Sequence, residues 1–142
     1  MRFPEPQTGL VLSYGFLWSD EAARGQSESV KDRPCAVVVA LRNDHGTQVT
    51  LVPITHSPPG PSQDHVELTP DECRVAGLDG LPHWVVVREV NAFLWPGFDL
   101  REIPGRGRCD YGRLPPATMK RVIAAILALR SKGLPMSRTN RD

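Results

Sequence analysis

The sequence predicts a mainly β domain, in which a small antiparallel sheet or barrel is followed by one C-terminal α-helix. The chain has 142 residues, the usual size of one domain. Its 14 prolines and 12 glycines turn the chain often, which favours short strands over long helices. A barrel is expected because closure removes the exposed edge strands that an open sheet of this size would have.

The first half of the chain predicts a hairpin of two long strands. Residues 9–17 read as a first strand, and a long polar loop follows over residues 18–33. The run at 35–41 is rich in valine, which predicts a buried central strand. An Asn-Asp-His-Gly turn at 43–46 suits the backbone of a hairpin, so we expect residues 48–54 to return as the partner strand.

The second half begins with shorter elements. Residues 65–68 predict a short strand, after which Thr69 and Glu72 have the pattern of a capping box at the start of a helical turn. Residues 84–90 predict another buried strand, and residues 98–103 a last short one.

One long helix is predicted over residues 116–132. Two prolines mark its start and Gly133 marks its end. Apolar residues recur on one face at helical spacing, namely Met119, Val122, Ile123, Ile126 and Leu127. Residues 134–142 predict a flexible basic tail, which leaves a single domain over residues 1–133.

Composition and cysteine content argue against several classes of protein. Hydrophobic residues make up 40% of the chain and charged residues 23%, as in globular rather than disordered proteins. No apolar run reaches the about 18 residues of a membrane span, and the N-terminus has no apolar signal core, so we expect a cytoplasmic protein without membrane contact. Three cysteines without a CxxC pair argue against a disulfide framework and a thiolate zinc site.

The formal net charge of +1 hides an asymmetry along the chain. Residues 1–100 carry 7 Lys/Arg and 13 Asp/Glu, whereas residues 101–142 carry 10 and 3. A basic C-terminal third can attract phosphate groups. The alternative is a solvated helix face followed by a basic tail.

The common catalytic and nucleotide-binding signatures are missing from the sequence. Its histidines stand apart from one another, at His45, His56, His65 and His83. A metal site could therefore arise only through the fold, and we expect neither a metal nor a cofactor.

Arg33 stands where the long polar loop enters the predicted central strand. Pro34 restricts the backbone beside it, and the guanidinium offers five donors and a permanent charge, which suits a phosphate. The alternative is an ion pair with a carboxylate nearby in the sequence, that is, with Asp20, Glu28 or Asp32.

A second polar segment, Thr55, His56 and Ser57, follows the partner strand. If the two central strands pair, Arg33 and Thr55 both lie at the open end of the hairpin. A cation, two hydroxyls and an imidazole at that place can bind a phosphodiester and move protons around it. The alternatives are turn capping for the two hydroxyls and an exposed loop position for the imidazole.

The order of these motifs resembles the PemK/MazF-type toxins of bacterial toxin–antitoxin systems. That family begins with a Gly-Asp-Ile/Val-type strand, where this chain has Gly-Leu-Val from Gly9. The family's Arg-Pro-(Ala/Val)-Val-Val run matches Arg-Pro-Cys-Ala-Val from Arg33, and its later Pro-(Ile/Leu)-Thr matches residues 53–55. The final helix matches residues 116–132, and the resemblance is closest over residues 9–57.

This resemblance implies a compact SH3-like barrel with a C-terminal helix, which forms a homodimer. It implies a growth-inhibiting endoribonuclease that cleaves single-stranded RNA at short sequences without a metal, by attack of the 2′-hydroxyl. Carried over to this chain, Arg33 would stabilise charge on the phosphate, and Thr55 would hold it. An antitoxin protein would silence the activity with a disordered tail that covers the RNA groove.

One departure from the family pattern concerns the acidic segment. Many members have Asp-Gln-(Ile/Pro)-Arg after the third main strand, where this chain has Arg-Glu-Val-Asn at residues 88–91. We expect Glu89 to replace the acid, and Arg88 and Asn91 to contact RNA. Either His56 or Glu89 would then be the general base.

Three further residues are candidate RNA contacts, namely Lys31, Ser57 and Trp95. Lys31 lies in the segment that replaces a Gly-rich turn of the family. Trp95 belongs to an aromatic segment without a family counterpart, and stacking on a base would contribute about 1–3 kcal/mol. The alternative is that these aromatic residues belong to the core and a turn.

Two other functions fit the same pattern. Gyrase-poisoning toxins share the SH3-like barrel and act by binding a protein, although no residue of this chain matches their active tail. A barrel that has lost the chemistry would bind nucleic acid without cutting it. The missing Gln and Arg near residues 90–92 favour this last interpretation.

Overall fold

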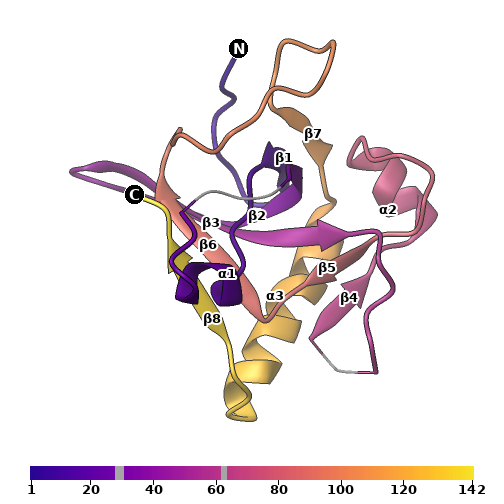
Figure 1. Cartoon of the computed structure of the whole chain (residues 1–142). Coiled ribbons are helices and arrows are strands. Elements are labelled where there is room, and N and C mark those ends of the chain that lie inside the picture. The colour runs from indigo at the N-terminus through magenta and orange to yellow at the C-terminus, as the bar shows by residue number, and fades with distance from the viewer. Residues whose placement is uncertain (28–30, 62–63) are drawn as a thin grey trace.

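The computed structural model describes residues 1–27, 31–61 and 64–142. Over these residues the protein is mainly β, as predicted, and the long helix lies near its C-terminal end (Figure 1). The strands are β1 (Leu10–Tyr14), β2 (Arg33–Asn43), β3 (Gly46–Thr55), β4 (His65–Glu67), β5 (Trp84–Val86), β6 (Glu89–Leu94), β7 (Asp110–Arg113) and β8 (Ser137–Asn140). The helices are α1 (Ser19–Ala23), α2 (Pro70–Val75) and α3 (Pro116–Ser131).

The eight strands belong to one sheet, whose neighbours run β4-β5-β3-β2-β1-β7. β6 pairs with another stretch of β3, and β8 pairs with β6. All these pairs are antiparallel except β6 with β8. Among the described residues β4 and β7 remain the two ends of the path, so these pairings do not close the sheet into the expected barrel.

The predicted hairpin of two long strands is confirmed. β2 and β3 pair from Asn43 with Gly46 at the turn to Cys35 with Pro53 near the open end. Gly46 has a φ of 124°, a backbone conformation that a side chain would strain. The hairpin forms because its β-branched residues fit a pleated, buried surface.

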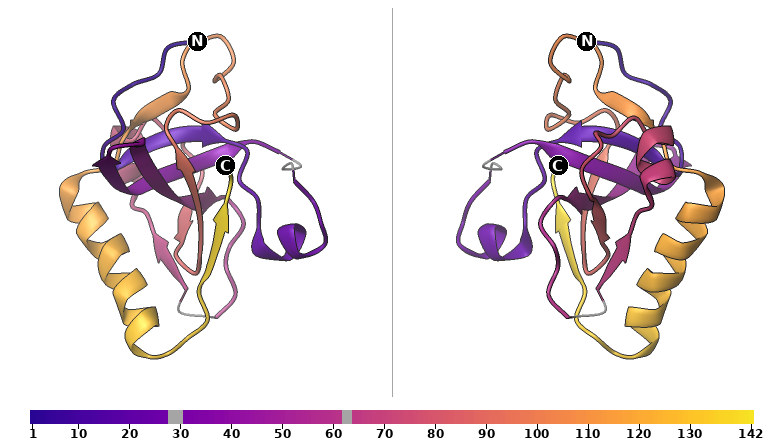
Figure 2. Two further views of the ribbon diagram at one scale, coloured as in Figure 1. Left: turned by 90° about the vertical axis from the view of Figure 1, so that its left-hand side faces the viewer. Right: turned by 90° about the vertical axis from the view of Figure 1, so that its right-hand side faces the viewer.

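Two hydrophobic clusters cover the two faces of this hairpin. Alternation along β2 sends Ala36 into one cluster and Cys35 and Val37 into the other. The first cluster packs under α3, where Met119 and Val122 are buried. Figure 2 shows α3 flanking one side of the strands and α1 lying on the other side. Each fully buried aliphatic side chain stabilises the fold by roughly 1.5–3 kcal/mol.

The predicted buried face of α3 is correct in the first half of the helix and wrong in the second half. Met119 and Val122 are buried, but Leu127 is 53% exposed and Leu129 takes its place in the core. A regular helix advances by about 100° per residue, so the buried stripe drifts around the helix over four turns.

The secondary structure differs from the sequence prediction in four segments of the chain. The loop 18–33 contains the short helix α1, and the run 84–90 is divided into β5 and the start of β6. Residues 98–103 form no strand, and β7 at Asp110–Arg113 pairs with β1 instead. In place of a flexible tail, β8 extends alongside β6.

The three cysteines are buried and unpaired. None of the helices in the described part of the chain is long and apolar enough to cross a membrane.

Candidate functional site

Arg33 is the first residue of β2, where it pairs with Tyr14 of β1. Its guanidinium carbon lies 5.1 Å from the centre of the Trp18 ring, so the cation rests on an aromatic face. Its Nε is buried and has no hydrogen-bond partner among the described residues. The Trp18 ring therefore orients the guanidinium, and the one donor without a described partner is buried.

Two of the three carboxylates that the alternative interpretation offered to Arg33 pair elsewhere. Asp20 lies 3.3 Å from Arg24, and Asp32 lies 3.5 Å from Arg101. Glu28, the third alternative, lies outside the described residues. Within the described ranges, the ion pair of Arg33 with Asp20 or Asp32 is therefore not formed.

Thr55 ends β3 at the same open end of the hairpin. The paired register of β2 with β3 ends at Cys35 and Pro53; continued by two residues, it would set Arg33 opposite Thr55, on the face that carries the buried Cys35. The Thr55 hydroxyl oxygen accepts a hydrogen bond of 3.0 Å from the backbone N–H of Ser57, so its own proton remains free to donate. Ser57 is exposed and shapes this turn.

Glu89 begins β6 and lies on the same face, but its carboxylate is already engaged. One oxygen accepts a hydrogen bond of 2.7 Å from the backbone N–H of Ser19, and the other lies 3.2 Å from Arg88. Arg88 also forms an ion pair of 2.5 Å with Asp64. A cleft of about 520 Å³ lies here, lined by Trp18, Ser19, Asp20, Glu21, Arg24, Arg88 and Glu89.

His56 lies apart from this group. Its ring contacts Asp79 and His83, beside a cavity that also contains Leu78. Leu78 packs against the first core cluster, which is on the other face of the hairpin. The convergence of Arg33 and Thr55 thus stays a prediction from the strand register, whereas His56 contacts Asp79 and His83 instead.

The prediction that Asn91 contacts RNA does not fit the structure, because this residue is fully buried. Its side-chain oxygen accepts from the backbone N–H of Leu17 at 2.9 Å, and its amide nitrogen donates to the Leu17 carbonyl at 2.8 Å. Glu21 accepts from the N–H of Trp18 at 3.0 Å. Together with the bond from Ser19 to Glu89, these contacts hold the backbone that presents Trp18.

The other predicted RNA contacts differ in exposure. Trp95 is half-buried and packs against the second core cluster, with its ring 6.2 Å from that of Phe93. Lys31 is exposed beside the start of β2. Packing thus accounts for Trp95, whereas Lys31 remains accessible to a ligand of Arg33.

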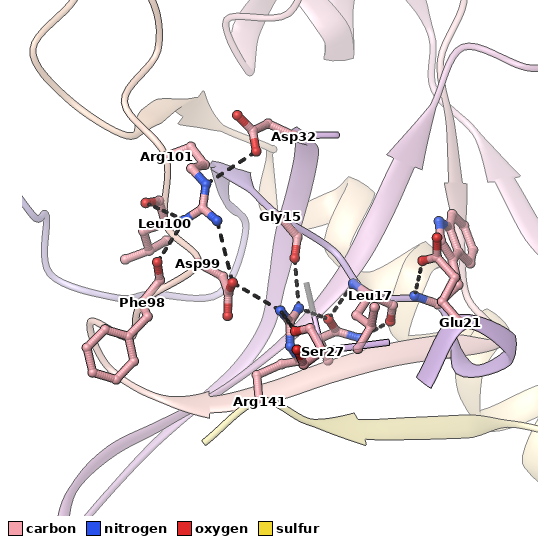
Figure 3. Close-up of polar contacts among 12 residues, drawn as sticks. Gly15, Leu17, Glu21, Ser27, Asp32, Phe98, Asp99, Leu100, Arg101 and Arg141 are labelled. Atoms are coloured by element: carbon pink, nitrogen blue, oxygen red, sulfur yellow. Dashed lines mark hydrogen bonds and ion pairs between the residues drawn. The ribbon is translucent and has the colours of Figure 1, made fainter. Parts of the chain in front are cut away.

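Arg141 is a residue that the sequence did not single out. Its side chain is only 4% exposed and forms an ion pair of 3.0 Å with Asp99 (Figure 3). It donates to the Gly15 carbonyl at 2.7 Å and to the Asn91 side-chain oxygen at 3.0 Å. Arg141 thus connects the C-terminal end of the chain to Gly15, which lies three residues before Trp18.

The thiol nearest to Arg33 is unsuited to nucleophilic chemistry. Burial raises the pKa of Cys35 well above its ordinary value, and the charges of Arg33 and Arg141 offset only part of that rise. The thiol faces the Arg33 carbonyl at 3.6 Å. A protonated, enclosed thiol is a poor nucleophile, so the chemistry of this region depends on its cation and hydroxyl.

A guanidinium that lies on an indole ring is a suitable donor for a phosphate or another oxyanion, and a nearby hydroxyl could add a further hydrogen bond. The signal for Arg33 and Thr55 was present in the sequence, because both flank a recognisable hairpin. Trp18 and Arg141 carried no local signal, since their roles depend on contacts far along the chain. The sequence matches no model of a known protein family, and a search of curated proteins found no match either.

Proposed function

We propose that this protein binds single-stranded RNA at Arg33 and cleaves it without a metal, as the PemK/MazF-type toxins do. The observation that carries the proposal is the Arg33 guanidinium, which lies on the Trp18 ring and forms no ion pair with the described residues. Thr55 ends the partner strand, where the register of β2 with β3, if continued, would set it opposite Arg33. The mainly β fold with its C-terminal helix agrees with the family resemblance. On this proposal the protein is a growth inhibitor that forms a homodimer and is neutralised by an antitoxin.

The cleavage step would need no group from outside the RNA and the protein. The 2′-hydroxyl gives its proton to a base while its oxygen attacks the adjacent phosphorus, and the 5′-oxygen takes up a proton as its bond to phosphorus breaks. The products are a 2′,3′-cyclic phosphate and a 5′-hydroxyl. Arg33 would stabilise the charge that develops on the phosphate oxygens, and the Thr55 hydroxyl would donate to one of them.

Glu89 is better placed than His56 to accept the 2′-hydroxyl proton, because the register of β6 with β3, continued by two residues, would set it beside Pro53, the partner of Cys35. Its two oxygens are, however, bonded to Ser19 and Arg88. This occupation favours a second candidate function, in which the same site binds RNA but does not cut it. Both functions place a phosphate at Arg33.

The test is a cleavage assay on a long unstructured RNA in the presence of EDTA. We expect discrete fragments with cyclic-phosphate ends from the wild type. Arg33→Ala should lower the rate about 100-fold or more, because one donor to a developing oxyanion has that effect in other enzymes.

The matched control is Arg42→Ala, which removes an exposed arginine from the far end of the same strand. This variant should cleave like the wild type. If the wild type leaves the RNA intact, and only Arg33→Ala loses RNA binding, the second candidate function is favoured, namely RNA binding without cleavage. Equal cleavage by both variants would refute the assignment of Arg33.

A further inference from the structure

His56, Asp79 and His83 form a compact cluster on the other face of the hairpin. Their possible ligand atoms all lie within 4.8 Å of one another. His83 Nε2 is 3.0 Å from one oxygen of Asp79, and His56 Nε2 is 3.6 Å from the other. The two imidazole ring centres are 4.4 Å apart.

The fold itself produces this cluster. β3 pairs with β5 through Thr55 and Trp84, so the next residues out, His56 and His83, face each other across the strands. The side chain of Asp79 accepts a hydrogen bond of 3.0 Å from the N–H of Leu81, which holds the carboxylate in place. Two adjacent strands and one short turn therefore fix all three groups.

The contacts of His56 require a positive charge, either a second proton on the ring or a cation between the ring and Asp79. Its Nδ1 lies 3.3 Å from the Pro82 carbonyl oxygen, while its Nε2 faces the carboxylate. Both of these oxygens only accept hydrogen bonds, but a neutral imidazole has only one N–H. With the proton on Nδ1, the lone pair of Nε2 points at the carboxylate, and a positive ion between them relieves the repulsion.

We infer that His56, Asp79 and His83 bind one divalent transition-metal ion, with Zn²⁺ as the preferred ion. Two imidazoles and a carboxylate are a ligand set that Zn²⁺ uses in proteins. The contact from Nδ1 to the Pro82 carbonyl is the arrangement that orients a metal-bound histidine.

Three protein ligands leave a fourth position of tetrahedral Zn²⁺ for water or an anion. The cluster borders a cavity of about 260 Å³, whose lining includes Arg106 and Tyr111. This inference is independent of the proposed ribonuclease, because the cluster and Arg33 lie on opposite faces of the hairpin.

The test is a calorimetric titration of Zn²⁺ into chelator-treated protein that carries no histidine tag. We expect one ion per chain in the wild type and at least a tenfold loss of affinity in His56→Ala. Asp79→Asn should show a similar loss, although its amide oxygen can still accept from Leu81. His45→Ala is the matched control, because His45 is exposed in the hairpin turn.

A second readout separates metal binding from loss of fold. Zn²⁺ should raise the melting temperature of the wild type and of His45→Ala, but not that of His56→Ala. His56 is half exposed, so its removal should leave the metal-free protein folded. Equal Zn²⁺ affinity in all variants, or no Zn²⁺ binding by the wild type, would overturn the inference. A second proton on the His56 ring would then explain its contact with Asp79.

Discussion

Arg33 and Arg141 are two arginines in opposite environments. Arg141 is buried and surrounded by acceptors, namely Asp99, the Gly15 carbonyl and Asn91. Arg33 has an aromatic ring on one side, and its buried Nε has no hydrogen-bond partner among the described residues. A guanidinium whose donors are satisfied stabilises the fold. Arg33 is only half-buried, so part of its side chain remains accessible to a ligand.

Arg141→Ala should lower the free energy of unfolding by about 2 kcal/mol, because it removes a buried donor from the Gly15 carbonyl, the Asn91 oxygen and Asp99, of which Asp99 keeps its ion pair with Arg101. Urea unfolding at pH 7 measures this loss. The control is Arg138→Ala, an exposed change in the neighbouring strand β8 that should cost less than about 0.5 kcal/mol. Equal stability of the two variants would contradict the structural role of Arg141.

Trp18→Ala should weaken binding of an uncleavable 2′-O-methyl RNA about two- to fivefold. A cation–π contact at a partly exposed site contributes about 0.5–1 kcal/mol, and its loss frees the guanidinium to move. Trp18→Phe keeps an aromatic face and should recover most of the affinity. Fluorescence anisotropy of a labelled RNA provides the measurement, and unchanged affinity in Trp18→Ala would contradict the role of this ring.

Among the elements, those that depend on local pattern were predictable. The β2–β3 hairpin follows from a run of valines and a turn, and the α2 cap at Thr69 from a capping box. The site residues Arg33 and Thr55 could be predicted for the same reason, since they flank this hairpin.

Elements that depend on distant contacts were not predictable. β8 is polar, and it forms a strand because β6 offers a free edge and Arg141 anchors the end of the chain. The run 84–90 is interrupted because the Val87 N–H bonds to the Asp64 carbonyl and Arg88 pairs with the Asp64 side chain. The burial of Asn91 also depends on a partner 74 residues away.

Glu72 of α2 contacts Thr118 and Arg121 of α3. This contact should make the free energy of unfolding depend on pH. Burial acts to raise its pKa, but hydrogen bonds from Thr118, the Thr69 backbone and Arg121 outweigh it and lower the pKa to about 2. A carboxyl whose folded pKa is depressed stabilises the protein above its unfolded pKa of about 4.3. That contribution is lost as the pH falls from about 4 to 2.

Glu72→Gln should therefore be less stable at pH 7 by about 1.5 kcal/mol, the lower end of the range for hydrogen bonds to charged groups, because the contact with Arg121 is exposed. Its free energy of unfolding should also change less steeply than that of the wild type between pH 5 and 2. Denaturant unfolding at several pH values tests both, with the exposed Glu102→Gln as the control. If the free energy of unfolding of Glu72→Gln and of the wild type changed in parallel with pH, this would contradict the role of Glu72.

At the scale of the whole molecule, the charge asymmetry of the sequence is partly balanced in space. Arginines of the C-terminal third pair with acids of the first hundred residues, as in Arg101 with Asp32, Arg121 with Glu72 and Arg141 with Asp99. These ion pairs give the basic C-terminal third a structural role. The phosphate site that we propose lies instead at Arg33, in the acidic part of the chain.

The two proposed sites should act independently, because they lie on opposite faces of one hairpin. His56→Ala should leave RNA affinity unchanged, and Arg33→Ala should leave Zn²⁺ affinity unchanged. The double variant should show both losses without an additional effect, as expected for sites that share no partner. A loss of RNA affinity in His56→Ala would contradict this separation.

The most direct test of the central claim is the salt dependence of RNA binding. Affinity of the wild type and Arg33→Ala for a 2′-O-methyl RNA would be measured at several salt concentrations, with Arg42→Ala alongside. If Arg33 binds a phosphate, its removal should weaken binding at least tenfold. The slope of log affinity against log salt concentration should also become shallower by about 1, because one phosphate contact is lost. Equal affinity and equal slope in Arg33→Ala and the wild type would contradict the claim that Arg33 binds the RNA backbone.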